Sequence, residues 1–91
     1  MLFLLTTPET GVLKTVDQLA GDEDKELLLI SDAVYLARES MAEALAEHSF
    51  DEVYVEEAAL AKRHLKAAAH ETVDMERIVE IILENKKLIQ L

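Results

Sequence analysis

The sequence contains no cysteine among its 91 residues. Without a thiol, the chain cannot form disulfides, thiolate metal sites, a catalytic thiolate or a persulfide of its own. Glycine and proline are also scarce, at two residues and one, while 51% of the residues are hydrophobic. This composition excludes a disordered or low-complexity chain and leaves little material for long loops. We therefore expect one small domain that spans residues 1–91.

Basic residues are few as well, with nine lysines and arginines against nineteen aspartates and glutamates. The net charge of −10 repels the phosphate backbone, so we expect no direct contact with nucleic acid. Three of the bases cluster at Lys62, Arg63 and Lys66, with His64 between them. This cluster marks either the end of a helix, where cations complement the dipole, or a patch that binds a partner.

Long hydrophobic runs are missing too. The apolar runs at residues 2–5 and 27–30 are far too short for a signal peptide or a membrane span. We therefore expect a cytoplasmic protein that is not bound to a membrane.

What the sequence does contain is organised around residues 26–35. Leu27–Ile30 is a solid apolar run without alternation, which is typical of a central parallel strand that is covered on both faces. Ser31 and Asp32 interrupt this run, and a helical pattern begins at once. Either side chain can accept a hydrogen bond from a free backbone N–H of the first helical turn.

Apolar spacing along the whole chain predicts alternating strands and helices. The predicted strands are residues 2–5, 26–30, 52–55, 71–73 and a short strand or tail at 86–91; the predicted helices are 12–19, 33–47, 56–65 and 75–84. Residues 66–70 stay open, since their alanines favour continued helix. Gly21, Asp74 and Asn85 are predicted helix caps, Asn85 in a left-handed conformation. This order predicts an α/β fold, with three layers α/β/α and a mostly parallel four- to five-stranded sheet.

Motifs for chemistry are few. The chain has no nucleophile elbow, no phosphate-binding loop and no dinucleotide fingerprint. Its three histidines are not at metal-ligand spacing. We therefore predict no catalytic residues, no bound cofactor and no metal site.

The residues that we expect to contact a partner or ligand follow the first two strands, where α/β sheets gather their sites. They are Thr6, Thr7, Ser31, Asp32 and Tyr35. Two interpretations of Asp32 remain open: it caps the helix that follows, or it presents its carboxylate to a partner or ligand.

Several segments in order resemble the DsrH/TusB family, the small non-catalytic members of the DsrE/DsrF/DsrH group. They are the opening Met-Leu, the stretch 26–35 with its Asp32-Ala33-Val34 step, the strand Val53–Val55, the segment Leu60-Ala61-Lys62-Arg63 and the step Val73-Asp74-Met75. The resemblance extends over nearly the whole chain.

That resemblance implies a three-layer domain that associates with DsrE-like and DsrF-like (TusD/TusC-like) subunits in a sulfur-relay complex. In this family, DsrE-like subunits carry sulfur as a cysteine persulfide, and the TusBCD relay passes it towards 2-thiouridine at the tRNA wobble position. Related complexes act in dissimilatory sulfur metabolism. Since this chain has no thiol, we expect a non-enzymatic, supporting subunit of a homo- or hetero-oligomer. The alternative is a homo-oligomeric module that binds a small ligand at the strand ends and has no relay role.

Overall fold

The structure is a computed structural model that describes residues 1–67 and 70–91. Its elements are β1 (Leu2–Leu5), α1 (Gly11–Ala20), β2 (Glu26–Leu29), the 3₁₀ segments η1 (Ser31–Ala37) and η2 (Glu39–Met41), α2 (Ala42–Ala46), β3 (Glu52–Glu56), α3 (Glu57–Lys62), β4 (Glu71–Val73), α4 (Met75–Glu84) and β5 (Leu88–Gln90). The alternation of strands and helices predicted from the sequence is therefore confirmed.

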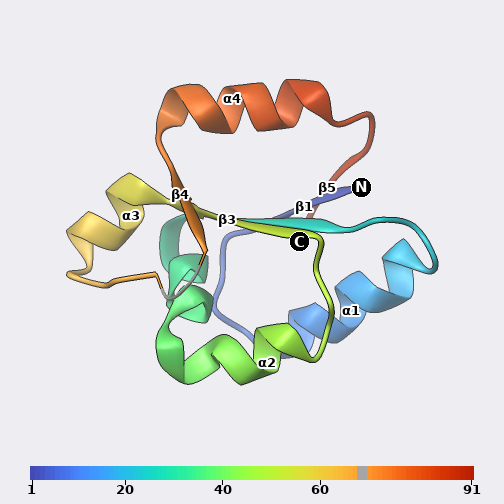
Figure 1. The fold of residues 1–91 in the computed structure, drawn as a ribbon, viewed down its shortest axis with the longest axis horizontal. Coiled ribbons are helices and arrows are strands. Elements are labelled where there is room, and N and C mark those ends of the chain that lie inside the picture. The colour runs from blue at the N-terminus through green and yellow to red at the C-terminus, as the bar shows by residue number, and fades with distance from the viewer. Residues whose placement is uncertain (68–69) are drawn as a thin grey trace.

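The five strands form one parallel sheet in the order β4-β3-β2-β1-β5 (Figure 1). The central strands are the predicted apolar runs, in register from Leu2 opposite Glu26 to Leu5 opposite Leu29. The segment at 86–91 is a strand and not a tail, and β5 pairs with β1 at the edge of the sheet. The predicted α/β fold with a parallel sheet is confirmed.

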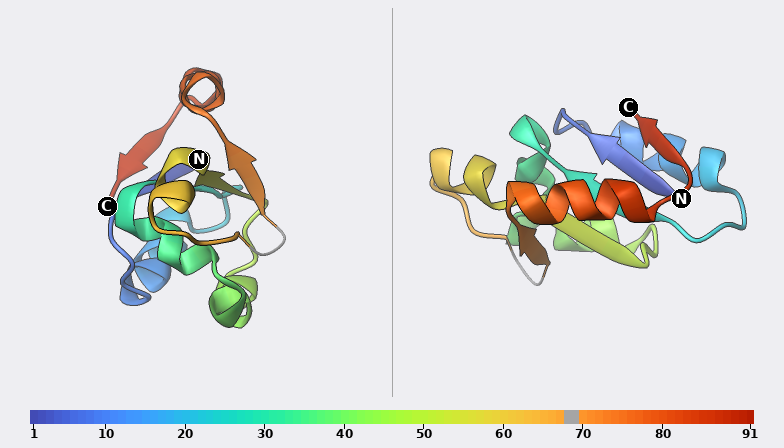
Figure 2. Two further views of the ribbon diagram at one scale, coloured as in Figure 1. Left: turned by 90° about the vertical axis from the view of Figure 1, so that its left-hand side faces the viewer. Right: turned by 90° about the horizontal axis from the view of Figure 1, so that it is seen from above.

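Helices cover the two faces of the sheet unequally. Among the described residues, α4 is the one helix over one face, while α1, η1, η2 and α2 lie against the other (Figures 1 and 2). Successive strand residues point to opposite faces, so Leu2 packs beneath α4 and Phe3 packs in the core on the other side. The core on the α1/α2 side is the larger of the two.

Two of the three predicted caps are confirmed. Gly21 ends α1 with φ 57°, and its N–H donates to the carbonyl of Asp17. The Asp74 carboxylate accepts a hydrogen bond from the N–H of Arg77 at 2.8 Å. The prediction for Asn85 is wrong, because its φ of −97° is not left-handed. Its side chain instead donates to the carbonyl of Ile81 at 2.8 Å, which satisfies the helix end by another route.

The predicted continuous helix at 33–47 is wrong. The chain forms η1, η2 and the short α2, with an extended Arg38 (φ −65°, ψ 152°) between the first two. The buried residues of η1 are the pairs Ala33/Leu36 and Val34/Ala37. Each pair is three residues apart, which is the repeat of a 3₁₀ helix, and apolar spacing alone does not separate it from an α-helix.

The predicted helix at 56–65 is shorter than expected. α3 ends at Lys62, and His64 is left-handed with φ 54°. The N–H groups of His64 and Leu65 donate back to the carbonyls of Ala61 and Leu60, the double hydrogen bond of a Schellman end. Of the open segment 66–70, residues 68 and 69 lie outside the described residues.

Candidate functional site

The candidate site lies where three neighbouring parallel strands end. Leu5, Leu29 and Val55 occupy the same row of the sheet, in β1, β2 and β3. The residues just after these strands therefore meet at one edge, which we call the carboxyl edge. Parallel strands make this convergence unavoidable, and it is the usual place for sites in open α/β sheets.

Ser31 makes the sharp turn at the end of β2. Its φ is 52°, in the left-handed region that side-chain-bearing residues rarely adopt. The N–H of Ser31 donates to a carboxylate oxygen of Glu56 at 3.0 Å, from the end of the neighbouring strand β3. Such a backbone conformation costs of order 1–3 kcal/mol and persists only where surrounding contacts hold it. Glu56 is the contact that holds this one.

Asp32 forms an ion pair and does not cap η1. No side-chain cap is present at the start of η1, so the capping interpretation of Ser31 and Asp32 is wrong. Instead, one Asp32 oxygen accepts hydrogen bonds from Arg63 Nη2 at 2.7 Å and Nε at 3.1 Å. Arg63 Nη1 also donates to the carbonyl of Ala59 at 3.1 Å. The Arg63 side chain is only 17% exposed, against 60% for Asp32, so the pair fastens η1 to the end of α3.

A shallow hollow of about 240 Å³ opens beside this ion pair. It is lined by Ser31, Glu56, Ala58, Ala59, Lys62 and Arg63. We call it the Arg63 hollow. Two cations and one carboxylate face it, which suits a small polar or charged group rather than an apolar one.

Only part of the predicted contact set reaches this hollow. Ser31 lines the hollow. Asp32 does not line it but accepts a hydrogen bond from Arg63, which does. Thr6 and Thr7 follow β1 in the next row of the sheet and do not line it. Tyr35 is half-buried in η1, where its ring lies 5.3 Å from the guanidinium carbon of Arg38. A partner contact by these residues stays a prediction.

Arg63 and Glu56 belong to the site, but sequence reasoning did not select them. The sequence places Arg63 in the basic cluster and in the family-like segment Leu60-Ala61-Lys62-Arg63, but its partner lies 31 residues earlier in the chain. A signal in the sequence is the concentration of bases at the end of α3 in an otherwise acidic chain. That signal marks a region but not a contact.

A second hollow, of about 270 Å³, lies on the other side of α3. It is mainly apolar and is lined by Glu56, Glu57, Ala58, Ala61, Val73, Asp74 and Met75. We call it the Met75 hollow. Its charged neighbours are all carboxylates, so the two hollows of the carboxyl edge differ in both polarity and charge.

His48 and His70 lie away from the two hollows, whereas His64 follows Arg63 at the end of α3. At the opposite, amino edge of the sheet, Asp17 bonds both Lys25 and His48, and these two hydrogen bonds lower the pKa of the Asp17 carboxyl. Burial lowers the pKa of His70. Among residues 1–67 and 70–91, no three side chains of the metal-binding types are grouped to hold a metal ion.

Charged side chains of the carboxyl edge are bound within the protein. Asp32 and Arg63 neutralise each other, and Glu56 is engaged with a backbone N–H. No helix in the described part of the chain has the length and apolar character needed to cross a membrane.

Comparison with known proteins gives a family. Residues 8–88 match the family model described as DsrH-like protein, which covers most of the chain. A search of the curated proteins finds no match.

Proposed function

Because the chain belongs to the DsrH-like family, we propose that it is a non-catalytic subunit of a sulfur-relay complex. Its neighbours in that complex are DsrE-like and DsrF-like (TusD/TusC-like) subunits, of which the DsrE-like one carries the sulfur as a persulfide. A cytoplasmic relay towards 2-thiolation of the tRNA wobble uridine is the pathway we favour. The family match over residues 8–88 is the observation that carries the proposal.

The absent thiol defines the role within such a complex. A persulfide forms only on a sulfur atom of the carrier, and the transfer step requires a thiolate as nucleophile. This chain contains no cysteine, so it supports the transfer by shaping or shielding the site of a neighbour. Its candidate contact residues lie at the carboxyl edge, where Ser31 and Asp32 are held in place by Glu56 and Arg63.

The proposal is tested by reconstitution. The chain is co-expressed with the DsrE-like and DsrF-like proteins encoded in the same genome, and the purified assembly is weighed by native mass spectrometry. The DsrE-like cysteine is then loaded with radiolabelled sulfur as a persulfide. The rate at which this sulfur passes to an acceptor thiol is measured with and without this chain. We expect one complex that contains all three chains and a faster transfer when this chain is present. If the chain stays apart from both proteins, the proposal is wrong.

The two hollows at the carboxyl edge support the alternative, which is that the chain binds a small ligand. A thermal-shift screen of the isolated chain against nucleotides and sulfur metabolites tests it. A ligand present at a hundredfold over its dissociation constant adds about 2.7 kcal/mol to the free energy of unfolding. Stabilisation of that size by one compound, weakened by Arg63→Ala, would favour the alternative. A flat screen removes it.

A further inference from the structure

Exposed apolar side chains gather on one surface of the molecule. In the part of the chain that the structure describes, the large apolar residues that stand exposed are Leu19, Met75, Val79, Leu83 and Leu88. All but Leu19 belong to α4 and β5, and their exposed fractions run from 43% for Leu88 to 79% for Leu83. We call Met75, Val79, Leu83 and Leu88 the α4–β5 surface.

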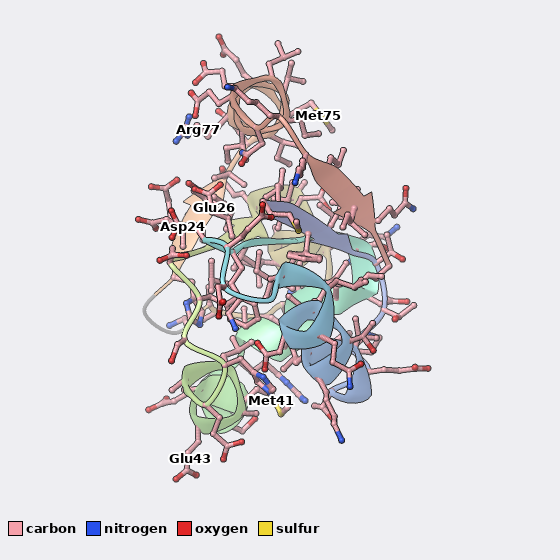
Figure 3. All side chains as sticks on the ribbon, turned by 90° about the vertical axis from the view of Figure 1, so that its right-hand side faces the viewer. Asp24, Glu26, Met41, Glu43, Met75 and Arg77 are labelled. Carbon is pink, nitrogen blue, oxygen red and sulfur yellow. The ribbon has the colours of Figure 1, made fainter. Side chains whose placement is uncertain are left out.

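The members of this surface lie on one side of α4. Met75, Val79 and Leu83 are four residues apart, so they form a single stripe along the helix. Figure 3 shows Met75 directed towards the β5 side of α4 and Arg77 directed towards the opposite side. On that opposite side, Arg77 contacts Glu71 of β4 and lies 5.9 Å from the ring of Tyr54. One flank of α4 is thus closed by the protein's own contacts, and the other is open.

The sheet continues this open flank. Leu88 is opposite Leu2 in the register of β5 and β1, and Leu2 packs beneath α4. Leu88 therefore shares the α4 face of the sheet, and half-buried Leu4 and Ile82 lie in the same cluster. A five-stranded sheet measures about 19 Å between its outer strands, and one helix is about 10 Å wide. α4 alone cannot cover the face, and on the β5 side the uncovered part includes Leu88 together with Gln90, which is opposite Leu4.

At its Met75 end, the stripe runs into the Met75 hollow. The hollow is apolar inside, and the charged residues around it are Glu56, Glu57 and Asp74. Exposed Glu76 and Glu80 continue the acidic rim along α4. The base on α4 itself is Arg77, which lies on the opposite flank and pairs with Glu80 at 3.3 Å. Lys86 and Lys87 follow the helix, and Lys87 pairs with Glu23. The hollow thus offers apolar walls and a carboxylate rim, which suit the stem and head of a lysine or arginine.

The charge of the chain indicates which kind of partner the α4–β5 surface binds. A second copy of this chain carries the same net charge of −10, and like charges brought face to face oppose association. A basic partner is favoured by the same term. We propose that the α4–β5 surface and the Met75 hollow together dock a different protein, whose contact surface is apolar at its centre and bears lysine or arginine at its rim.

This assignment rests on the proposed function for its probe, because the DsrE-like and DsrF-like chains supply the partner surfaces. The experiment is titration of the purified two-chain partner into labelled variants of this chain. Val79→Lys places a cation in the stripe, and Leu19→Lys on α1 is its matched control, since both side chains are 48% exposed. We expect Val79→Lys to weaken binding about tenfold or more and Leu19→Lys to leave it within about twofold.

A second pair tests the charge argument without touching the apolar residues. Glu57→Lys reverses one carboxylate of the rim, and Glu43→Lys reverses a carboxylate on α2, on the other side of the sheet (Figure 3). We expect Glu57→Lys to weaken binding severalfold and to flatten its dependence on salt. Glu43→Lys keeps the wild-type salt dependence. All four variants are checked by far-ultraviolet circular dichroism and urea unfolding, so that a folding defect is not counted as lost binding.

The outcomes separate this inference from the proposed function. If the wild-type chain does not bind the partner chains, the proposed function fails. If wild type binds and Val79→Lys and Glu57→Lys bind equally well, the complex stands but docking through the α4–β5 surface is wrong. Sedimentation of the isolated chain completes the test. The isolated wild-type chain could sediment as a dimer that Val79→Lys dissociates and Leu19→Lys does not. That result would assign the surface to a second copy of the chain and overturn the proposal.

Discussion

The two faces of the sheet differ in how completely the chain covers them. On the α1/α2 face, four helical segments enclose a continuous core that includes Phe3, Leu13 and Leu36, each no more than 1% exposed. On the α4 face, Ile78 and Ile81 are buried, whereas Met75, Val79 and Leu83 remain in solvent. Apolar residues on a covered face stabilise the fold, and an exposed apolar group is typical of an association surface. The comparison therefore separates a face whose apolar residues are enclosed from a face on which α4 leaves part of its apolar residues exposed.

The largest effect is expected when a leucine on the enclosed face is compared with one on α4. Leu13→Ala, on α1, removes a side chain that is 1% exposed and should cost about 2–5 kcal/mol of the free energy of unfolding. Leu83→Ala, on α4, removes one that is 79% exposed and should change it by no more than about 0.5 kcal/mol. Urea unfolding followed by circular dichroism measures both. Equal losses would show that α4 buries Leu83 in the isolated chain.

A smaller effect is expected at the start of α4. Asp74→Ala removes the carboxylate that accepts from the Arg77 N–H and should cost about 1 kcal/mol. Urea unfolding measures the loss, and hydrogen exchange should show it in the amides of α4, whose first turn Asp74 caps. Asp74→Asn, which keeps a capping oxygen, is the matched control. Unchanged urea unfolding of Asp74→Ala would contradict this prediction.

The ion pair at the carboxyl edge should contribute less again. A double-mutant cycle of Asp32→Asn and Arg63→Gln should give a coupling energy of about 0.5–1 kcal/mol, since Asp32 is 60% exposed and water screens the pair. Urea unfolding of the four proteins provides the values. A coupling energy of zero would mean that the ion pair does not hold η1 against α3. Arg63 would then not be fixed beside the Arg63 hollow by Asp32.

The smallest expected effect depends on pH and concerns the α1/α2 side. Hydrogen bonds from Lys25 and His48 lower the pKa of Asp17 below its ordinary value of 3.8. Because the folded pKa is the lower one, the contribution of Asp17 is fully present above about pH 4 and is lost as pH falls through the folded value. Asp17→Asn should therefore lose less stability than wild type between pH 4 and lower pH. Parallel acid titrations that never diverge would contradict this.

The strands were predictable because their signal is local. Leu27–Ile30 is apolar throughout, and such a run fits a strand that is buried on both sides. Gly21 and Asp74 were predictable for the same reason, since each residue type suits its cap by its own backbone freedom or side chain. The family assignment also follows from the order of these local segments along the chain, which the match over 8–88 confirms.

The failures have a common cause as well. Apolar spacing predicts one α-helix over 33–47, but packing against the sheet selects the three-residue repeat of η1. Asp32 was open between a cap and a contact, and the choice depended on Arg63, 31 residues away. Neither the packing of η1 on the sheet nor the pairing of Asp32 with Arg63 can be predicted from the residues that adjoin them in the sequence. Sequence patterns rank local possibilities, and distant partners choose among them.

For this protein, the sequence by itself determined the α/β class, the family, the lack of any thiol chemistry and the strongly acidic surface. These follow from which residues are present and how they alternate. Only the tertiary structure decided that Ser31 and Asp32 are bound by Glu56 and Arg63, and that α4 leaves an apolar flank beside β5. The physical reason is that exposure and ion pairing belong to residues brought together across the sheet, and the order of strands β4-β3-β2-β1-β5 sets which residues those are.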